Sequence, residues 1–120
     1  MADDEVWSDA PEVVRVHLEA VRRGDPVAMA ADYATDAIVE RPEGSIVGRE
    51  AIEEYFRGVP ARLAGGRVTF ESVDVHESDH VTFHWRIVGG PGDGTAGADT
   101  VVLRDGQIAQ QRVHLHGPDF

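Results

Sequence analysis

The sequence predicts an α+β domain in which helices cover one face of a curved antiparallel sheet. Two observations support this prediction. Before Gly66, most apolar residues recur at helical spacing, whereas after it they alternate with period two, as in half-buried strands. In the second half, turn-forming sequences also separate four strand-length runs, which is typical of an antiparallel meander.

Three helices are expected in the first half of the chain. The first runs from Pro11 to Arg23, because apolar residues follow one of its faces and Gly24 is a usual residue just after a helix. A short second helix begins at Asp25-Pro26, where proline suits the first turn. The third helix is the segment Gly48–Gly58, and residues 60–66 lead away from it.

One short strand precedes the third helix, and four strands follow it. The short strand, Ala37–Arg41, ends at Pro42, which cannot donate to a sheet ladder. Asp105-Gly106 predicts a tight hairpin turn between the last two strands. The four later strands are expected at Arg67–His76, His80–Val88, Ala98–Arg104 and Gln107–His116.

The composition is that of an acidic globular protein. The chain has 120 residues, of which 11 are basic, all of them arginine, and 22 are acidic, so its net charge is −11. Such a charge repels nucleic acids and anionic membranes, and neither is expected as a partner. The absence of cysteine excludes disulfides and cysteine-based metal sites.

The ends and domain limits also follow from composition. We expect residues 1–10 to form an acidic flexible arm, which Trp7 could attach to the body, before a single domain at residues 11–120. No apolar run approaches the roughly 20 residues of a membrane span. No signal peptide is predicted, because the first residues are acidic, and we therefore expect a cytoplasmic location.

Four polar side chains alternate along the last strand. One face of this strand carries Gln110, Arg112, His114 and His116. Imidazoles transfer protons near neutral pH and guanidinium groups bind anions, so we interpret this face as the wall of a cavity. An exposed sheet face, a subunit interface and a metal site completed by His84 or Asp99 are the alternatives.

The strand His80–Val88 poses the same choice of face. Parity with the last strand places His84 on the cavity side and Trp85 outward, where it would pack in a dimer. In the reverse arrangement, Phe83, Trp85 and Ile87 line the cavity and His84 meets solvent.

Several motifs follow one another along nearly the whole chain. They are Arg22–Pro26 (RRGDP), Tyr33–Gly44 (YATDAIVERPEG), Gly48–Phe56 (GREAIEEYF), His84–Arg86 (HWR) and Asp99–Ile108 (DTVVLRDGQI). In this order they resemble the nuclear-transport-factor-2-like superfamily, and most of all its ketosteroid isomerase and SnoaL-like polyketide cyclase branch. The resemblance implies a cone-shaped, curved antiparallel sheet wrapped around three N-terminal helices. The fold hosts enzymes of several kinds and non-catalytic domains, so the resemblance alone does not define a reaction.

The resemblance also implies roles for individual residues. Ketosteroid isomerases bind the substrate oxyanion with a tyrosine and a protonated aspartic acid, and these positions correspond to His17 and Asp99. Their general base stands just before the proline of the short first strand. This chain has Arg41 there, which keeps its proton at physiological pH, so the family's mechanism cannot run unchanged. Tyr55 and Phe56 fall where aromatic residues line the mouth of the cavity.

Structural roles compete with these assignments. His17 lies on the apolar stripe of its helix, which is also typical of a core histidine bonded to a carbonyl group. Asp99 is also typical of an aspartate at a hairpin end, although its alignment with Val101 favours an interior position. Arg41 and Arg112 are equally compatible with structural ion pairs.

We expect a cofactor-independent acid–base enzyme that isomerises, cyclises or dehydrates a hydrophobic polyketide- or steroid-like molecule and works as a homodimer. The expected catalytic residues are His17, Asp99, His114 and His116, with a histidine of the last strand as the base. The expected substrate-binding residues are Arg41, Tyr55, Phe56, His84, Trp85, Val101 and Arg112. The alternatives are a dimeric module that binds a ligand without turnover and a His-ligated metal enzyme; the first hypothesis needs no metal and no cofactor.

Overall fold

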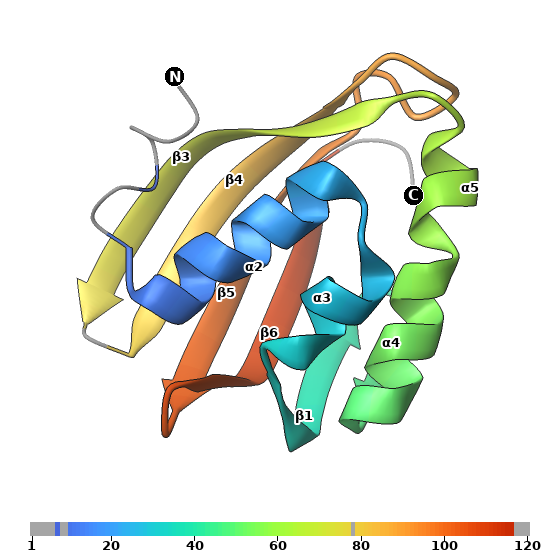
Figure 1. The fold of residues 1–120 in the computed structure, drawn as a ribbon. Helices are drawn as coiled ribbons and strands as arrows, with labels where there is room; N and C mark the ends of the chain where they lie inside the picture. Colours follow the sequence, from blue (N-terminus) through green and yellow to red (C-terminus); the bar gives the residue numbers. More distant parts are fainter. Residues whose placement is uncertain (1–6, 8–9, 78, 117–120) are drawn as a thin grey trace.

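The computed structural model describes residues 7, 10–77 and 79–116, and it leaves the side chain of residue 116 undescribed. The helices are α2 (Glu12–Arg23), α3 (Pro26–Ala31), α4 (Arg49–Arg57) and α5 (Val59–Leu63). The strands are β1 (Tyr33–Arg41), β2 (Gly44–Val47), β3 (Arg67–Glu77), β4 (His80–Val88), β5 (Ala96–Arg104) and β6 (Gln107–His116). Figure 1 shows the helices in front of the sheet, which confirms the predicted α+β class.

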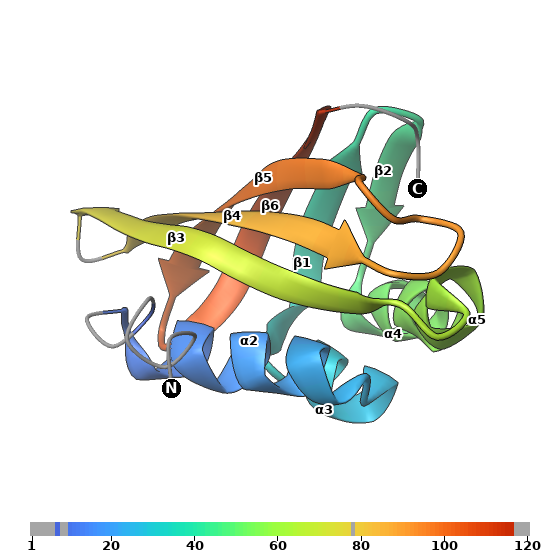
Figure 2. The same cartoon turned by 90° about the horizontal axis from the view of Figure 1, so that it is seen from above.

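The six strands form one open, strongly twisted sheet in the order β2-β1-β6-β5-β4-β3. All neighbouring pairs are antiparallel except β1 and β6, which run parallel. Helices α2 and α3 lie against one face of the sheet, and α4 and α5 continue this layer at the end that carries β1 and β2 (Figure 2). The hollow between the two layers is where a ligand site can form.

Helix α2 begins one residue later than predicted and ends at Gly24, whose positive φ of 69° directs the chain out of the helix. It buries Val14 and Leu18 against the sheet together with His17. Of the expected acidic arm, the structure describes two residues. Trp7 is buried with its ring 5.3 Å from that of Phe70, and Ala10 is buried next to it; residues 1–6 and 8–9 lie outside the described part.

The expectation that the polar face of the last strand lines the cavity is wrong for Arg112 and His114. Both side chains are exposed on the outer face of the sheet, and Arg112 donates to a carboxylate oxygen of Glu40 at 2.7 Å. The opposite face of β6 points inward because Val113 and Leu115 remove apolar surface from water there. His116 belongs to β6, but its side chain lies outside the described part.

Strand β4 follows the reverse of the expected arrangement. Phe83, Trp85 and Ile87 are buried, whereas the side chain of His84 is 39% exposed and lies 3.8 Å from a carboxylate oxygen of Asp74. The reason is again burial, because three large apolar side chains outweigh one imidazole in deciding which face meets the core. Within the described part of the chain, no helix is long and apolar enough to cross a lipid bilayer.

Candidate active site

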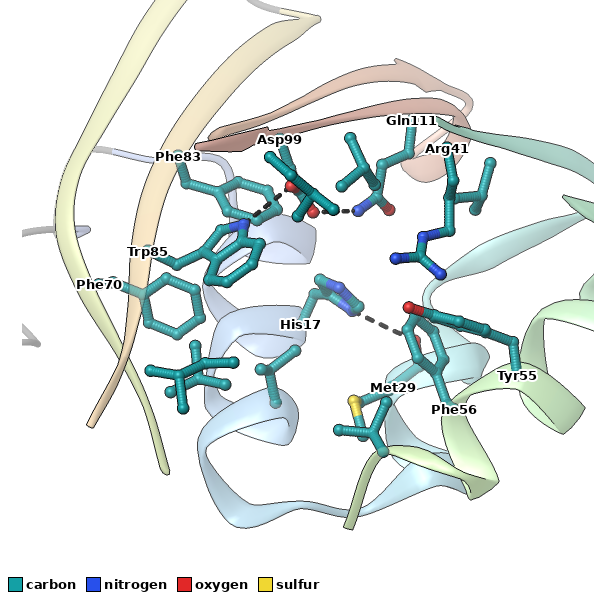
Figure 3. A pocket seen from close by; sticks show the side chains of 17 residues that line it. His17, Met29, Arg41, Tyr55, Phe56, Phe70, Phe83, Trp85, Asp99 and Gln111 are labelled. Atoms are coloured by element: carbon teal, nitrogen blue, oxygen red, sulfur yellow. Dashed lines mark hydrogen bonds between the residues drawn. The ribbon is translucent and has the colours of Figure 1, made fainter. Parts of the chain in front are cut away.

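A cavity of about 110 Å³ lies between the helices and the inner face of the sheet (Figure 3). Most of its wall is apolar, from the valines and aromatic residues of β1, β3, β4, β6 and α4. Six described side chains carry polar groups into this wall: His17, Arg41, Tyr55, Trp85, Asp99 and Gln111. A mostly apolar hollow with a few convergent polar groups is the usual form of a small-molecule site.

Asp99, on β5, is the one carboxylate that the described residues place in this wall. Its Oδ1 accepts a hydrogen bond from Nε1 of Trp85 at 2.9 Å, and its Oδ2 accepts one from Nε2 of Gln111 at 2.6 Å. Burial raises the pKa of Asp99 from its ordinary value of 3.8 to about 6, although these two hydrogen bonds and the electrostatic effects of His17 and Arg41 act in the opposite direction. The carboxyl group therefore changes its charge close to neutral pH.

The orientation of Gln111 depends on a second layer of buried groups. The hydroxyl of Tyr33 donates to the amide oxygen of Gln111, which leaves the amide nitrogen directed at Asp99. Burial raises the pKa of Tyr33 well above 10, so its hydroxyl keeps the proton that it donates. His17 completes this layer, with Nε2 3.4 Å from the hydroxyl of Tyr33 and Nδ1 3.2 Å from the carbonyl oxygen of Met29.

Arg41 occupies the end of β1, and its side chain is only 7% exposed. Its guanidinium carbon lies 4.7 Å from the centre of the Tyr55 ring, and Nη1 lies 3.3 Å from a carboxylate oxygen of Glu43. Its Nε is buried without a hydrogen-bond partner. Burial also raises the pKa of Tyr55, whereas Arg41 and Arg62 lower it, so the tyrosine stays neutral beside these cations.

The structure brings together six of the predicted site residues. His17, Arg41, Tyr55, Phe56, Trp85 and Asp99 all line the cavity. It does not bring His84, Arg112 and His114 to the cavity, and Val101 is fully buried in the core rather than in the cavity wall. Gln111 was not predicted. Gln111 shares one face of β6 with Val113 and Leu115, and this alternation could have revealed it. A polar residue on an otherwise apolar strand face is expected to be a buried polar group.

The expected metal alternative can be compared with the described side chains. Among them, the acidic and histidine residues close enough to share an ion are Glu77, Asp79 and His80. This group lies at the exposed turn between β3 and β4, away from the cavity. Exposed acidic groups of this kind are common on protein surfaces, so the group carries no functional assignment.

A comparison with protein families matches residues 14–111 to the SnoaL-like domain. The chain belongs to the SnoaL-like family. A steroid Δ-isomerase from Nocardioides simplex is 34% identical to this SnoaL-like protein in an alignment of 112 positions that covers 88% of each chain. The predicted family is thus confirmed.

Two solved structures illustrate how widely the SnoaL-like fold is shared. A candidate polyketide cyclase from Sinorhizobium meliloti superimposes with a TM-score of 0.75 at 24% identity, covering 89% of this chain and 97% of the other. A SnoaL-like protein of unknown function from Burkholderia thailandensis gives 0.78 at 18% identity, covering 92% and 97%. At these identities the likeness shows the fold alone.

Proposed function

We propose that this SnoaL-like protein is a cofactor-independent enzyme that moves a proton at the carbon next to a carbonyl group of a hydrophobic small molecule. Asp99 is the group that accepts and returns the proton. One observation carries this proposal: the buried carboxyl group of Asp99, with a pKa of about 6, stands in the wall of an apolar cavity that also contains a buried arginine. A proton-transfer group works best when its pKa lies near the operating pH.

The chemistry follows from the contacts of Asp99. Trp85 uses one lone pair of Oδ1, and Gln111 uses one lone pair of Oδ2. Each oxygen of Asp99 therefore keeps a second lone pair that can accept a substrate proton. When the ionised carboxylate takes the α-proton, the C–H electron pair moves into the carbonyl group and gives an enolate. The positive charge of Arg41 stabilises this negative charge in a site of low dielectric constant. In a ketone with a carbon–carbon double bond between the β and γ carbons, the protonated Asp99 then returns the proton to the γ carbon, and the double bond shifts to the α and β carbons, which completes an isomerisation. In a ketone without this double bond, the proton returns to the α carbon and the result is exchange.

The size of the cavity limits how the substrate is held. At about 110 Å³, the cavity is closer in volume to a cavity of about 150 Å³ that binds benzene than to the several hundred cubic ångströms of most drug-sized sites. One ring of a steroid- or polyketide-like ketone fits this space, and the rest of the molecule extends through the mouth. The steroid Δ-isomerase relative supports a ring ketone as the reacting group.

The direct test is exchange of α-protons for deuterium in a ring ketone such as cyclohexanone, followed by proton NMR in heavy water. The enzyme should accelerate exchange over buffer, with a rate that rises as Asp99 ionises around pH 6. His114→Ala is the matched control: it removes an exposed imidazole of the outer sheet face and should leave the rate within about twofold. Exchange that matches buffer at every pH, for ketones of one to four rings, would contradict the proposal.

Replacing Trp85 by phenylalanine should move the pH dependence in a defined direction. The indole N–H lowers the pKa of Asp99 by bonding its ionised form, and phenylalanine lacks this donor. The midpoint of the rate profile should therefore rise above the wild-type value of about 6. The measurement is the exchange rate between pH 5 and pH 9, and a midpoint that stays in place or falls would show that Trp85 does not act through Asp99.

A second candidate function is binding without turnover. The observation in its favour is Arg41, which stands where the family resemblance places a general base. Ligand-dependent thermal stabilisation by ketones, without exchange or product formation, would support this function. The homodimer expected from the sequence stays a prediction, which sedimentation of the purified protein can test.

A further inference from the structure

We propose that the ligand of this cavity carries a planar oxyanion, either a carboxylate or the enolate of a 1,3-dicarbonyl, on a small apolar body, and that Arg41 binds this oxyanion. The inference rests on the proposed function, because it names the substrate class of the same site. It starts from the side chain of Arg41, of which only 7% is exposed.

Burial of this guanidinium is unfavourable unless its donors are used. Removing a charged group from water carries a large penalty, which only good hydrogen bonds and opposite charges offset. The structure leaves Nε of Arg41 buried and without a partner. Buried polar atoms without partners are rare in folded proteins, and at a cavity wall they point to a missing ligand or water.

The contacts that Arg41 does make leave its charge available to the cavity. Glu43 contacts Nη1 at 3.3 Å, and its side chain is 54% exposed, which places this ion pair at the rim where solvent screens it. The Tyr55 ring covers one face of the Arg41 guanidinium group. A ring in this position does not accept the N–H bonds, which point outward in the plane of the guanidinium. Figure 3 shows the guanidinium pointing into the cavity between Gln111 and Tyr55.

The carboxylate of Asp99 acts on Arg41 only through space. The described hydrogen bonds of its oxygens come from Trp85 and Gln111, and the charge of Arg41 lowers the pKa of Asp99 without a described direct ion pair. A buried cation therefore faces a mostly apolar space, and the described acid that pairs directly with it, Glu43, is not among the residues that line this space. The planar fork of arginine matches the two oxygens of a carboxylate or of a 1,3-dicarbonyl enolate, and the apolar wall matches the body that carries them.

Benzoate and benzamide test this inference because they share a shape and differ in charge. Their binding is measured at pH 7 by NMR titration. The wild-type protein should bind benzoate at least about tenfold more tightly than benzamide. Arg41→Met should weaken benzoate binding by about 10- to 100-fold and leave benzamide binding nearly unchanged, because methionine keeps the apolar stem and removes the charge.

Arg62→Met is the matched control. The guanidinium of Arg62 lies at the same 4.7 Å from the centre of the Tyr55 ring, but Arg62 is not among the residues that line the cavity. This variant removes one positive charge from the same region and should keep the preference for benzoate. Equal losses in the two arginine variants would overturn the inference and leave a buried water as the partner of Nε. Equal binding of benzoate and benzamide by the wild-type protein would also overturn it if 1,3-cyclohexanedione does not bind either.

A second measurement does not depend on folding of the methionine variant. The Nε–H signal of Arg41, assigned by its absence in Arg41→Lys, should shift in the wild-type nitrogen–proton spectrum when benzoate is added and stay in place with benzamide. Titration with 1,3-cyclohexanedione, which ionises to an enolate, distinguishes the two sources of the oxyanion. A response to benzoate alone assigns a carboxylate, and a response to the dione alone assigns an enolate. No response to either anion overturns the inference.

The outcomes separate this inference from the proposed function. Asp99→Asn should bind benzoate more tightly than the wild-type protein, because the variant lacks a carboxylate that repels the anion. If Asp99-dependent exchange of cyclohexanone is observed but neither benzoate nor 1,3-cyclohexanedione binds through Arg41, the inference fails and the proposed function stands. If benzoate binds through Arg41 but Asp99→Asn exchanges cyclohexanone at the wild-type rate, the proposed function fails and the inference stands.

Discussion

Asp99→Asn is expected to lower the rate of α-proton exchange by about 10²–10⁴-fold while making the fold more stable at pH 8. The loss of rate follows because an amide cannot accept the proton. The gain in stability follows because the wild-type protein holds an ionised carboxylate in a buried position at this pH. A group with a purely structural role would show the opposite change in stability.

The sign of the stability effect comes from linkage. The folded protein holds the proton of Asp99 up to about pH 6, whereas the unfolded chain releases it near 3.8. The contribution of Asp99 to the free energy of unfolding is therefore fully present below pH 3.8 and is lost as pH rises through about 6. The difference between these pKa values corresponds to about 3 kcal/mol, which is the upper limit of the expected gain for asparagine at pH 8.

The hydrogen bonds around position 99 can adapt to asparagine. The side-chain oxygen of asparagine can accept the hydrogen bond from Trp85. Rotation of the Gln111 amide by 180° would then present the Gln111 oxygen to the side-chain nitrogen of asparagine. Tyr33 would then accept from Gln111 and donate to His17, whose Nε2 lies 3.4 Å away. Urea unfolding of both proteins at pH 4.5 and pH 8 measures the effect. A variant that is less stable at both values would show that the carboxylate supports the fold rather than the reaction.

Gly97→Ala is expected to destabilise the protein by about 1–3 kcal/mol, because it would overpack the site behind Asp99. A Cβ at position 97 would lie 2.6 Å from Cζ2 of Trp85 and 2.7 Å from the carbonyl oxygen of His114. The indole must move to make room, and its N–H then loses its alignment with Asp99. Both the free energy of unfolding and the rate of α-proton exchange should fall, as measured by urea unfolding and by NMR.

A double-mutant cycle can assign this effect to the indole. In Gly97→Ala combined with Trp85→Phe, the smaller ring removes the contact at Cζ2, although the contact with the carbonyl oxygen of His114 remains. The double variant should therefore lose less stability than the sum of the two single variants. Strictly additive losses would show that alanine at position 97 disturbs the backbone of β6 and not the indole.

Elements with a strong local pattern could be predicted from the sequence. The bounds of β4 and β6 match the expected ones, and α2 differs by one residue. The short elements β2 and α5 were not predicted, because four or five residues carry too little periodicity. The parallel pairing of β1 with β6 joins segments about 70 residues apart, and local patterns carry no information about such a pair.

The site residues could be predicted where the family resemblance supplied a position. They could not be predicted where the polarity of the side chains was used to choose which face of a strand lines the cavity. His17, Arg41 and Asp99 were placed by resemblance, and all three line the cavity. The choice of the histidine face of β6 was wrong because it gave more weight to chemically active side chains than to apolar ones. Val113 and Leu115 decide the face of that strand, since apolar burial dominates the free energy of folding.

The carbon-13 NMR titration of the Asp99 carboxyl carbon tests the central claim most directly. We expect a midpoint near pH 6, which should rise when benzoate occupies the cavity because a nearby anion disfavours ionisation. A midpoint near the ordinary value of 3.8 that does not respond to benzoate would contradict the account, since the carboxyl group would then be neither desolvated nor next to the ligand.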